Sequence, residues 1–303
     1  MTEIMTLDLR YRGSRETVAS YLADDGEGGF VLFESGPGSC RRQLAREVRR
    51  AGYSMPQLRA VFLTHIHLDH AGAAGTLARR TGCEVFVHPV GERHLLDPGA
   101  KLMPSARRLY GWKLPFIWGR MEAVPRGQVT SASDGQTFRV GSLEVIGWHT
   151  PGHASHHVAW QIGDSVVTGD VGGVRFPGTR YVAPPMPPPD IDVEKWRASV
   201  RLLRDLDPRQ LLLTHYGPVA DVGDHLDQLD GRMVRWSEIA REEVGADTDA
   251  ATVERRLTTF DDREVAEAGV PRALVERGRR ICPIGDSAAG LFRYWSTRPS
   301  AAG

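Results

Sequence analysis

The sequence HIHLDH at positions 65–70 constrains the fold of this 303-residue chain more than any other feature. It places four side chains that can bind metal within six positions, directly after an apolar run. Imidazole together with carboxylate suits zinc, iron or manganese. In extended backbone His65 and His67 share a face, because side chains two positions apart point the same way. Asp69 and His70 follow the bend, so the spacing predicts two neighbouring metal ions.

The composition is ordinary for a globular protein, with 41% hydrophobic and 25% charged residues. The formal net charge is zero and the pI is near 7.2, which predicts neither a nucleic-acid partner nor a membrane partner. The cysteines Cys40, Cys83 and Cys282 are far apart, so no disulfide framework is expected. The chain shows no signal-peptide pattern and no window near the roughly 20 apolar residues of a membrane span. We therefore expect a cytoplasmic protein.

Strand and helix patterns alternate through the first two thirds of the chain. Strands are predicted at 18–22, 30–33, 60–63, 83–87, 137–140, 143–148, 157–162, 165–168 and 210–213, and helices at 40–51, 71–81 and 192–206. Asp192 is a candidate N-cap of the last helix. This alternation predicts mixed sheets with outer helices. From about residue 221 the pattern is wholly helical, in segments 221–244, 249–259, 262–268, 271–280 and 285–296.

Residues 91–127 interrupt the alternation. They are rich in proline and glycine but also contain aromatic residues such as Trp112 and Trp118. An irregular segment of this kind predicts either a lid over a pocket or an interface, and simple packing on the core is the alternative. The same segment and the helical tail could form a homodimer interface. The proline-rich stretch 177–190 predicts a stiff extended connector.

Three further potential ligands stand where strands are predicted to end, namely His153, Asp170 and His215. Side chains that several strand ends deliver to one rim are typical of enzyme sites. A structural zinc site is usually closed by four ligands, often thiolates. This set instead offers seven candidate ligands and no nearby cysteine, which favours a catalytic site with two metals.

Taken together, these residues resemble the metallo-β-lactamase fold superfamily: HxHxDH, a later His, a bridging Asp and a final His. The resemblance covers about residues 1–220 and implies a catalytic domain of α/β (α+β) class. That domain is an αββα sandwich with the site at one edge, and 91–127 is its insertion or lid. Residues 221–303 form a helical C-terminal appendage. The resemblance implies that the first metal is held by His65, His67 and His153, the second by Asp69, His70 and His215, and that Asp170 bridges both.

The segments HTPGHASHH, GDVGG and THYGP, with the helical tail, are similar to an uncharacterised, distantly glyoxalase II-like hydrolase subgroup. The resemblance implies a metallohydrolase with two divalent ions, zinc foremost and iron or manganese as alternatives. Two cations that share a water lower its pKa from about 15.7 toward neutrality. We therefore expect a metal-bridging hydroxide to attack a small-molecule ester, thioester or lactone. Asp69 and Asp170 are candidate catalytic residues, and Tyr216 or Tyr181 could polarise the carbonyl unless it only packs.

Other functions stay open at this stage. A phosphodiesterase of the same fold is one, although relatives that process nucleic acid need a basic groove. A persulfide dioxygenase with a single iron is another, and the complete second ligand set disfavours it. A non-enzymatic scaffold would require an empty metal site.

Four further side chains are candidates for a supporting role. His149, His156 and His157 flank His153 and could either support the ligands from behind or simply pack. Glu34 stands where superfamily members commonly carry Asp in a strand-end Asp-Thr-Gly motif, and it could hydrogen-bond a ligand histidine.

Overall fold

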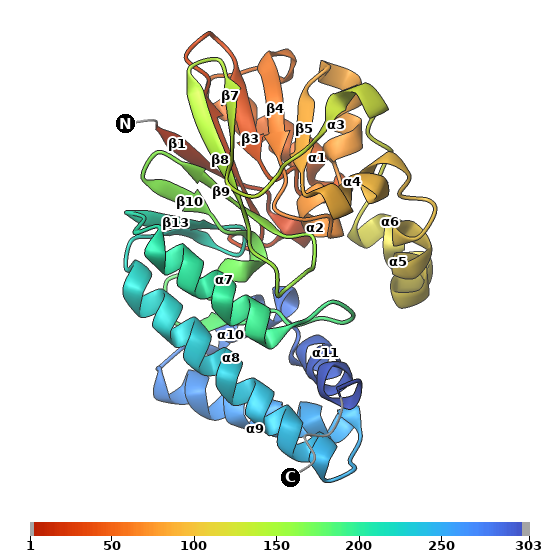
Figure 1. Ribbon diagram of the computed structural model, residues 1–303, viewed down its shortest axis with the longest axis vertical. Helices are drawn as coiled ribbons and strands as arrows, with labels where there is room; N and C mark the ends of the chain where they lie inside the picture. Colours follow the sequence, from red (N-terminus) through yellow and green to blue (C-terminus); the bar gives the residue numbers. More distant parts are fainter. Residues whose placement is uncertain (1–2, 299–303) are drawn as a thin grey trace.

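Two six-stranded sheets lie face to face, with helices on both outer surfaces, in the computed structural model, which describes residues 3–298 (Figure 1). Side chains from both sheets form the apolar layer between them, including Phe33 and Phe62 from one sheet and Val145 and Trp160 from the other. Because alternate strand residues point to opposite faces, each sheet buries one side here and the other under helices. The αββα layering that the resemblance implies is confirmed.

The first sheet has the strand order β1-β2-β3-β4-β5-β6. Strands β1 to β3 pair antiparallel and β3 to β6 pair parallel. The strands are β1 (Ile4–Asp8), β2 (Ala19–Asp24), β3 (Phe30–Phe33), β4 (Leu58–Phe62), β5 (Glu84–Val87) and β6 (Val129–Ser131). The two edge strands, β1 and β6, were not predicted, because most of their side chains are only half-buried and show no clear hydrophobic alternation.

The second sheet has the order β14-β13-β10-β9-β8-β7. Every neighbouring pair is antiparallel except β10 and β13. The strands are β7 (Gln136–Val140), β8 (Leu143–His149), β9 (Val158–Ile162), β10 (Ser165–Val167), β13 (Gln210–Leu213) and β14 (Gly217–Val219), with a separate small ribbon of β11 (Val174–Arg175) and β12 (Val182–Ala183). The predicted strands of this half of the chain are confirmed within one residue at either end, whereas β11, β12 and β14 were not predicted.

Helices of the first half pack on the first sheet. Leu44 and Val48 of α1 and Leu77 of α3 belong to the hydrophobic cluster on its outer face. The bounds are α1 (Arg41–Arg50), α2 (Leu68–Ala71), α3 (Ala74–Thr81) and α4 (Pro89–Leu96). The single helix predicted at 71–81 is wrong at its start, since the chain bends at Gly72 and Ala73 between α2 and α3.

Helices of the second half pack on the second sheet and continue into the C-terminal region. The bounds are α7 (Val193–Asp205), α8 (Val222–Gly245), α9 (Ala250–Glu267), α10 (Arg272–Ile281) and α11 (Ile284–Ser296). Val166 of β10 belongs to the same buried cluster as Leu229 of α8 and Leu291 of α11, so the helical C-terminal region shares a core with the sheet. The break predicted near residue 260 is wrong, because α9 is continuous. Among the described residues, no helix is long and apolar enough to cross a membrane.

The segment predicted to be irregular at 91–127 is largely helical, so that prediction is wrong. It contains the end of α4, helix α5 (Leu102–Tyr110), the 3-10 turn η4 (Gly111–Lys113) and helix α6 (Leu114–Ile117). Pro104 and Pro115 fall in the first turns of α5 and α6, where a backbone N–H has no partner in the helix. The prolines that suggested irregular backbone are therefore compatible with these helices.

Asp192 is confirmed as the N-cap of α7, with its Oδ1 accepting a hydrogen bond from the Lys195 backbone N–H at 3.2 Å. Asp192→Ala is expected to lower the free energy of unfolding by about 1 kcal/mol, because the Lys195 backbone N–H, which has no partner within the helix, loses its acceptor. Urea unfolding of the two proteins measures this difference. Asp192→Asn keeps an acceptor oxygen and should stay close to the wild type. Equal stability of the alanine variant would contradict the capping role.

Candidate metal centre

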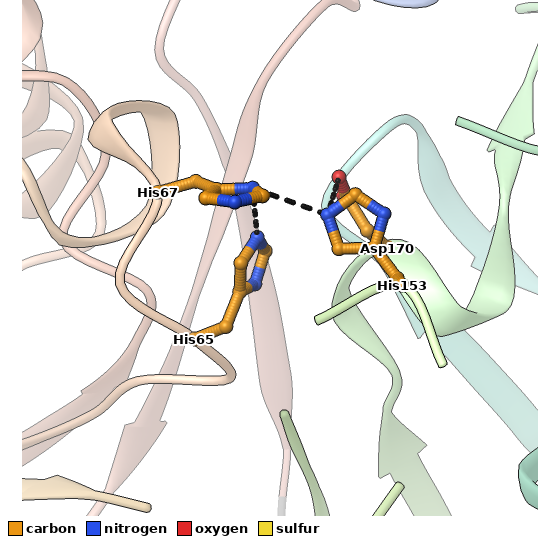
Figure 2. A group of neighbouring side chains, drawn as sticks. All are labelled: His65, His67, His153 and Asp170. Carbon is orange, nitrogen blue, oxygen red and sulfur yellow. Dashed lines mark hydrogen bonds and ion pairs between the residues drawn. The ribbon is translucent and has the colours of Figure 1, made fainter. Parts of the chain in front are cut away.

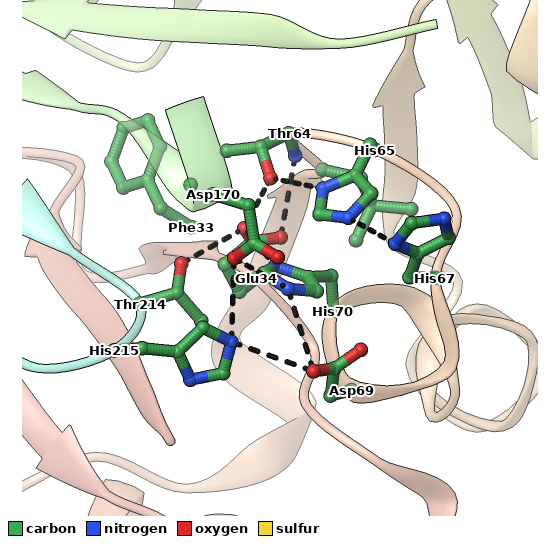
Figure 3. A network of polar contacts seen from close by, with 12 residues as sticks. Phe33, Glu34, Thr64, His65, His67, Asp69, His70, Asp170, Thr214 and His215 are labelled. Atoms are coloured by element: carbon green, nitrogen blue, oxygen red, sulfur yellow. Dashed lines mark hydrogen bonds and ion pairs between the residues drawn. The ribbon is translucent and has the colours of Figure 1, made fainter. Parts of the chain in front are cut away.

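Four chain segments deliver the predicted ligands to one edge of the two sheets. His65 and His67 lie in the loop after β4, and Asp69 and His70 lie in α2, the helix that follows this loop in sequence. The other three ligands each follow a strand of the second sheet. His153 follows β8, His215 follows β13, and Asp170 lies in the turn η6 (Gly169–Gly172) that follows β10. Figure 3 shows six of these side chains converging, and Figure 2 shows the seventh, His153, beside His65, His67 and Asp170. The structure therefore brings together all seven residues that the sequence predicted as ligands.

The first group consists of His65, His67, His153 and Asp170 (Figure 2). His67 Nδ1 lies 2.9 Å from His65 Nε2 and 3.1 Å from His153 Nε2. Asp170 Oδ2 lies 3.3 Å from His153 Nε2. One ligand atom of each residue lies within 4.8 Å of the others, which is compact enough for one ion to contact all four.

The second group consists of Asp69, His70 and His215. Asp69 Oδ2 lies 3.4 Å from His215 Nε2 and 3.7 Å from His70 Nε2. Asp170 faces this group as well, because its Oδ1 lies 3.2 Å from His70 Nε2 and 3.3 Å from His215 Nε2. One carboxylate thus presents an oxygen to each group, which is the arrangement that a bridging ligand requires.

Hydrogen bonds behind the ligands set the orientation of their rings. His153 Nδ1 lies 2.8 Å from the Pro185 carbonyl, and His215 Nδ1 lies 2.8 Å from the Thr17 carbonyl. A carbonyl oxygen can only accept, so both Nδ1 atoms carry the proton and donate. The Nε2 lone pair of each ring then points into the site, as metal binding requires.

Glu34 performs the same task for His70 and His65. His70 Nδ1 donates to Glu34 Oε1 at 2.8 Å, and Thr64 Oγ1 donates to the same oxygen at 2.5 Å. Since its proton is used in this way, Thr64 Oγ1 accepts from His65 Nδ1 at 3.0 Å. The predicted hydrogen bond from a ligand histidine to Glu34 is confirmed. The Glu34 backbone lies in the left-handed region, at φ 68°, which is uncommon for a residue other than glycine.

The donor set fits divalent cations. Among the described residues, the buried atoms His70 Nε2, Asp170 Oδ1 and His215 Nε2 have no hydrogen-bond partner, and buried polar atoms are rarely left so. His67 Nδ1 faces two lone pairs, on His65 Nε2 and His153 Nε2, and one proton can satisfy only one of them. Neutral imidazoles and carboxylates that converge without protons between them need a cation, and borderline divalent metals suit these donors.

The electrostatics of the two groups differ. Burial lowers the pKa of His65, and burial together with His153 lowers the pKa of His67 to about 4, so these rings are neutral ligands. Burial acts in the same direction on His70, but Asp170, Asp69 and Glu34 together raise its pKa. Burial raises the pKa of Asp69, yet His70 and His215 outweigh this effect and hold it at about 2. The carboxylates of Asp69, Asp170 and Glu34 thus favour positive charge at the second group, which a bound cation could supply.

The histidines that flank His153 have different surroundings. His157 is fully buried, stacks on the His65 ring at a centroid distance of 5.1 Å, and bonds Thr150 Oγ1 through Nδ1. His156 lies farther out, at 6.2 Å from the His65 ring. His149 bonds the Ala132 carbonyl, away from the ligands. Only His157 packs directly behind a ligand ring.

A pocket of about 420 Å³ opens onto the ligands His67, Asp69, His153 and Asp170. Its walls come from Tyr11 and Arg12 and from three further segments that are distant in sequence. These three are residues 102–118 with Leu102, Ala106, Leu109, Tyr110, Ile117 and Trp118, the connector 185–189, and the C-terminal region with Arg280, Ile281, Cys282, Pro283, Asp286 and Ser287. The predicted insertion 91–127 thus lines the pocket through residues 102–118, and the helical C-terminal region also contributes to the wall.

The structure does not bring the predicted tyrosines to this pocket. Tyr216 lines a separate cavity of about 490 Å³, because the chain turns into β14 directly after His215 and directs the next side chain elsewhere. The Tyr181 hydroxyl donates to the buried Asp261. Tyr11 and Tyr110 line the metal-binding pocket instead. Burial and the nearby Asp69 raise the pKa of Tyr110 to about 12 and that of Tyr11 still further, so both phenols stay protonated donors.

Gly169 precedes Asp170 and has a φ of +50°, and a Cβ there would lie 2.4 Å from Thr64 Oγ1 and 2.7 Å from His157 Nε2. Gly169→Ala is therefore expected to lower the free energy of unfolding by more than the ~1–2 kcal/mol of the left-handed conformation alone. Gly163→Ala is the matched control, since its φ is +56° and nothing lies within 4 Å of the added carbon. Chemical unfolding of both variants measures the difference. Equal losses would show that the contacts behind Asp170 are not tight.

The fold and the metal-binding groups place the chain in a known family. It belongs to the metallo-beta-lactamase superfamily, whose sequence pattern matches residues 13–215. Both the predicted resemblance and its fold are thereby confirmed.

Two curated relatives and two solved structures illustrate the similarity. The metallo-beta-lactamase fold-containing protein ST1585 of Sulfurisphaera tokodaii is 29% identical over 58% of this chain and 67% of its own length. The hydroxyacylglutathione hydrolase GloC of Haemophilus influenzae is 31% identical over 41% of this chain and 57% of its own. Other curated relatives are matched over about half their length.

The solved structures share the fold at lower identity. The ST1585 structure superposes with a TM-score of 0.60 at 24% identity, covering 78% of this chain and 94% of that one. The metallo-beta-lactamase family protein TTHA1429 of Thermus thermophilus reaches a TM-score of 0.70 at 21% identity, covering 97% of this chain and 92% of that one. The likeness therefore extends over the C-terminal helices as well.

Proposed function

We propose that the protein is a hydrolase that uses two divalent metal ions, zinc foremost, to cleave an ester, thioester or lactone. The observation that carries this proposal is the position of Asp170, which presents one oxygen to each of two adjacent, buried ligand groups. Iron or manganese would fit the same donors, and availability often decides between them.

The residues of the chain would each have a defined task. When bound, a metal pair activates a water as a nucleophile and polarises the oxygen of the scissile group. Glu34, Pro185 and Thr17 hold three ligand rings in the orientation that exposes Nε2. Asp69 stays ionised at neutral pH and can accept a hydrogen bond from a water in the site. The Tyr11 and Tyr110 hydroxyls can donate to a carbonyl oxygen of the substrate, the role that Tyr216 was predicted to have.

The lining of the pocket supports the proposed substrate class. Apolar side chains such as Leu102, Ile117 and Met186 line much of it, which suits an acyl or lactone group better than a highly charged phosphodiester. The name of one relative, a hydroxyacylglutathione hydrolase, supports thioesters as one member of this class. The complete second group, Asp69, His70 and His215, argues against a dioxygenase with a single iron.

A substrate panel tests this function. The protein is loaded with zinc, iron or manganese and is assayed on a p-nitrophenyl ester, an acyl thioester, a lactone and a bis(p-nitrophenyl) phosphate. We expect turnover of at least one acyl substrate and its loss on treatment with a chelator. Turnover of the phosphodiester alone would contradict the proposed acyl substrates and indicate a phosphodiesterase. Oxygen uptake with a persulfide, at one iron per chain, would overturn the proposal.

A further inference from the structure

Residues 101–120, which we name the basic lobe, form a projecting part of the surface that includes α5, η4 and α6 (Figure 1). Among the described residues, the three most exposed large hydrophobic side chains all lie in this lobe. Leu109 is 78% exposed, Trp112 77% and Phe116 78%. The Trp112 and Phe116 rings lie 6.1 Å apart, so they form one continuous patch. Apolar patches on a surface commonly mark a binding site.

The same lobe carries a concentrated positive charge. Its twenty residues include no Asp or Glu and five exposed basic residues, which are Lys101, Arg107, Arg108, Lys113 and Arg120. None of the five forms an ion pair within residues 3–298, whereas many other arginines of the chain do. The chain as a whole has no formal net charge. The lobe is therefore an uncompensated basic surface around an apolar patch.

We propose that the basic lobe docks on the surface of an anionic lipid bilayer. A short helical segment with Trp, Phe and Leu exposed beside Lys and Arg is the composition of an interfacial membrane contact, in which apolar side chains enter the headgroup region and basic ones meet anionic lipids. Leu109, Trp112 and Phe116 lie outside the buried cluster of the lobe, which includes Ala106 and Leu114. Docking of this kind needs no membrane-spanning helix.

Two other occupants fit the lobe less well. In a two-fold dimer through this surface, the five positive charges of one copy would face the five of the other, which is unfavourable without acidic partners. Single-stranded nucleic acid would meet the charge and could stack on Trp112 and Phe116, but it offers no apolar surface for the aliphatic Leu109, which is 78% exposed. An anionic bilayer matches both the charge and the aliphatic Leu109.

The position of the lobe links this surface to the pocket. Leu102, Ala106, Ile117 and Trp118 of the lobe line the metal-binding pocket, while Trp112 and Phe116 of the same segment face outward. Docking would therefore bring the pocket wall next to the lipid. The docking itself does not depend on the proposed hydrolysis, so it can be measured whether or not a substrate is known.

Vesicle flotation of the full chain tests the proposal. The protein is mixed with vesicles of phosphatidylcholine alone, or of phosphatidylcholine and phosphatidylglycerol in equal parts. We expect flotation with the anionic vesicles only, and its loss as salt is raised to about 1 M, where charges are screened within a few ångströms. Arg107→Glu/Arg108→Glu should weaken binding by more than about fivefold per charge. Trp112→Ala/Phe116→Ala should weaken it by about tenfold or more.

The matched control is Arg49→Glu/Arg201→Glu. It makes the same change in net charge at two exposed arginines, on α1 and α7, that form no ion pair within the described residues. Circular dichroism shows whether each variant is folded. Absence of flotation, or equal flotation of all variants, would overturn the proposal. Two further results would overturn the proposal if the protein binds no vesicles. One is a dimer in solution that is lost in the Trp112→Ala/Phe116→Ala variant, and the other is retention of the protein by single-stranded DNA.

Discussion

Asp170→Ala is expected to lower hydrolysis by more than about a hundredfold and to reduce the metal content. Partners behind a ligand typically contribute 10–100-fold in metal affinity or activity, and loss of a ligand itself should exceed that. Asp170 places a carboxylate oxygen near each group, at 3.3 Å from His153 Nε2 and 3.2 Å from His70 Nε2. The measurements are kcat/KM on the best substrate of the panel and metal content after gel filtration.

The control for this variant is Asp164→Ala, which removes an exposed carboxylate from the neighbouring turn, where it pairs with Arg209. It should leave both activity and metal content unchanged. Circular dichroism confirms that each variant is folded. Full activity of a folded Asp170→Ala protein would show that this carboxylate does not join the two groups.

Glu34→Gln is expected to weaken metal binding by about 10–100-fold while the protein stays folded. The carboxylate accepts hydrogen bonds from His70 Nδ1, Thr64 Oγ1 and Thr214 Oγ1 at 2.8, 2.5 and 3.2 Å. Glutamine has nearly the same shape but lacks the negative charge that strengthens the donor His70 as a ligand. Because His70 belongs to the second group, we expect the loss to appear there first.

Competition with a chelating indicator measures this loss for each metal equivalent. The exposed Glu144, which pairs with Arg139, gives the matched control Glu144→Gln. Weakening of both equivalents to the same extent would show that Glu34 acts on the whole site and not through His70. Unchanged affinity would remove Glu34 from the metal centre.

All seven candidate ligands were predictable from the sequence because each stands next to a recognisable strand end. The strand β13 (Gln210–Leu213), for example, is a short apolar run that stops directly before Thr214 and His215. Strong local patterns of this kind are independent of the rest of the fold. The resemblance to a known superfamily then supplied the grouping of the ligands, which spacing alone does not give.

The pocket walls were much less predictable, since they form where distant segments meet. Nothing around Tyr11 marks it in the sequence, and it reaches the pocket only because the first sheet places it against Trp118, at a ring distance of 5.1 Å. Tyr216 was predicted from its neighbour His215, but neighbours at a tight turn can point into different cavities. The C-terminal contribution around Arg280 depends on how α10 folds back on the sheets.

The local distribution of charge on the surface was also hard to predict from the sequence. The expectation that the chain has no membrane partner depended on a net charge of zero for the whole sequence. The structure separates the charges, and a lobe with five basic and no acidic residues surrounds the most exposed aromatic side chains. A sum over the chain cannot detect such a local surface, although a sliding window over 101–120 could have done so.

Metal quantification of the purified protein tests the central claim most directly. The chain is loaded with zinc, freed of excess by gel filtration and measured by inductively coupled plasma mass spectrometry against protein concentration. The arrangement of two donor groups around Asp170 predicts two ions per chain, with the second equivalent lost first in Glu34→Gln. One ion per chain at saturating zinc in the folded wild-type protein would contradict the two-metal centre.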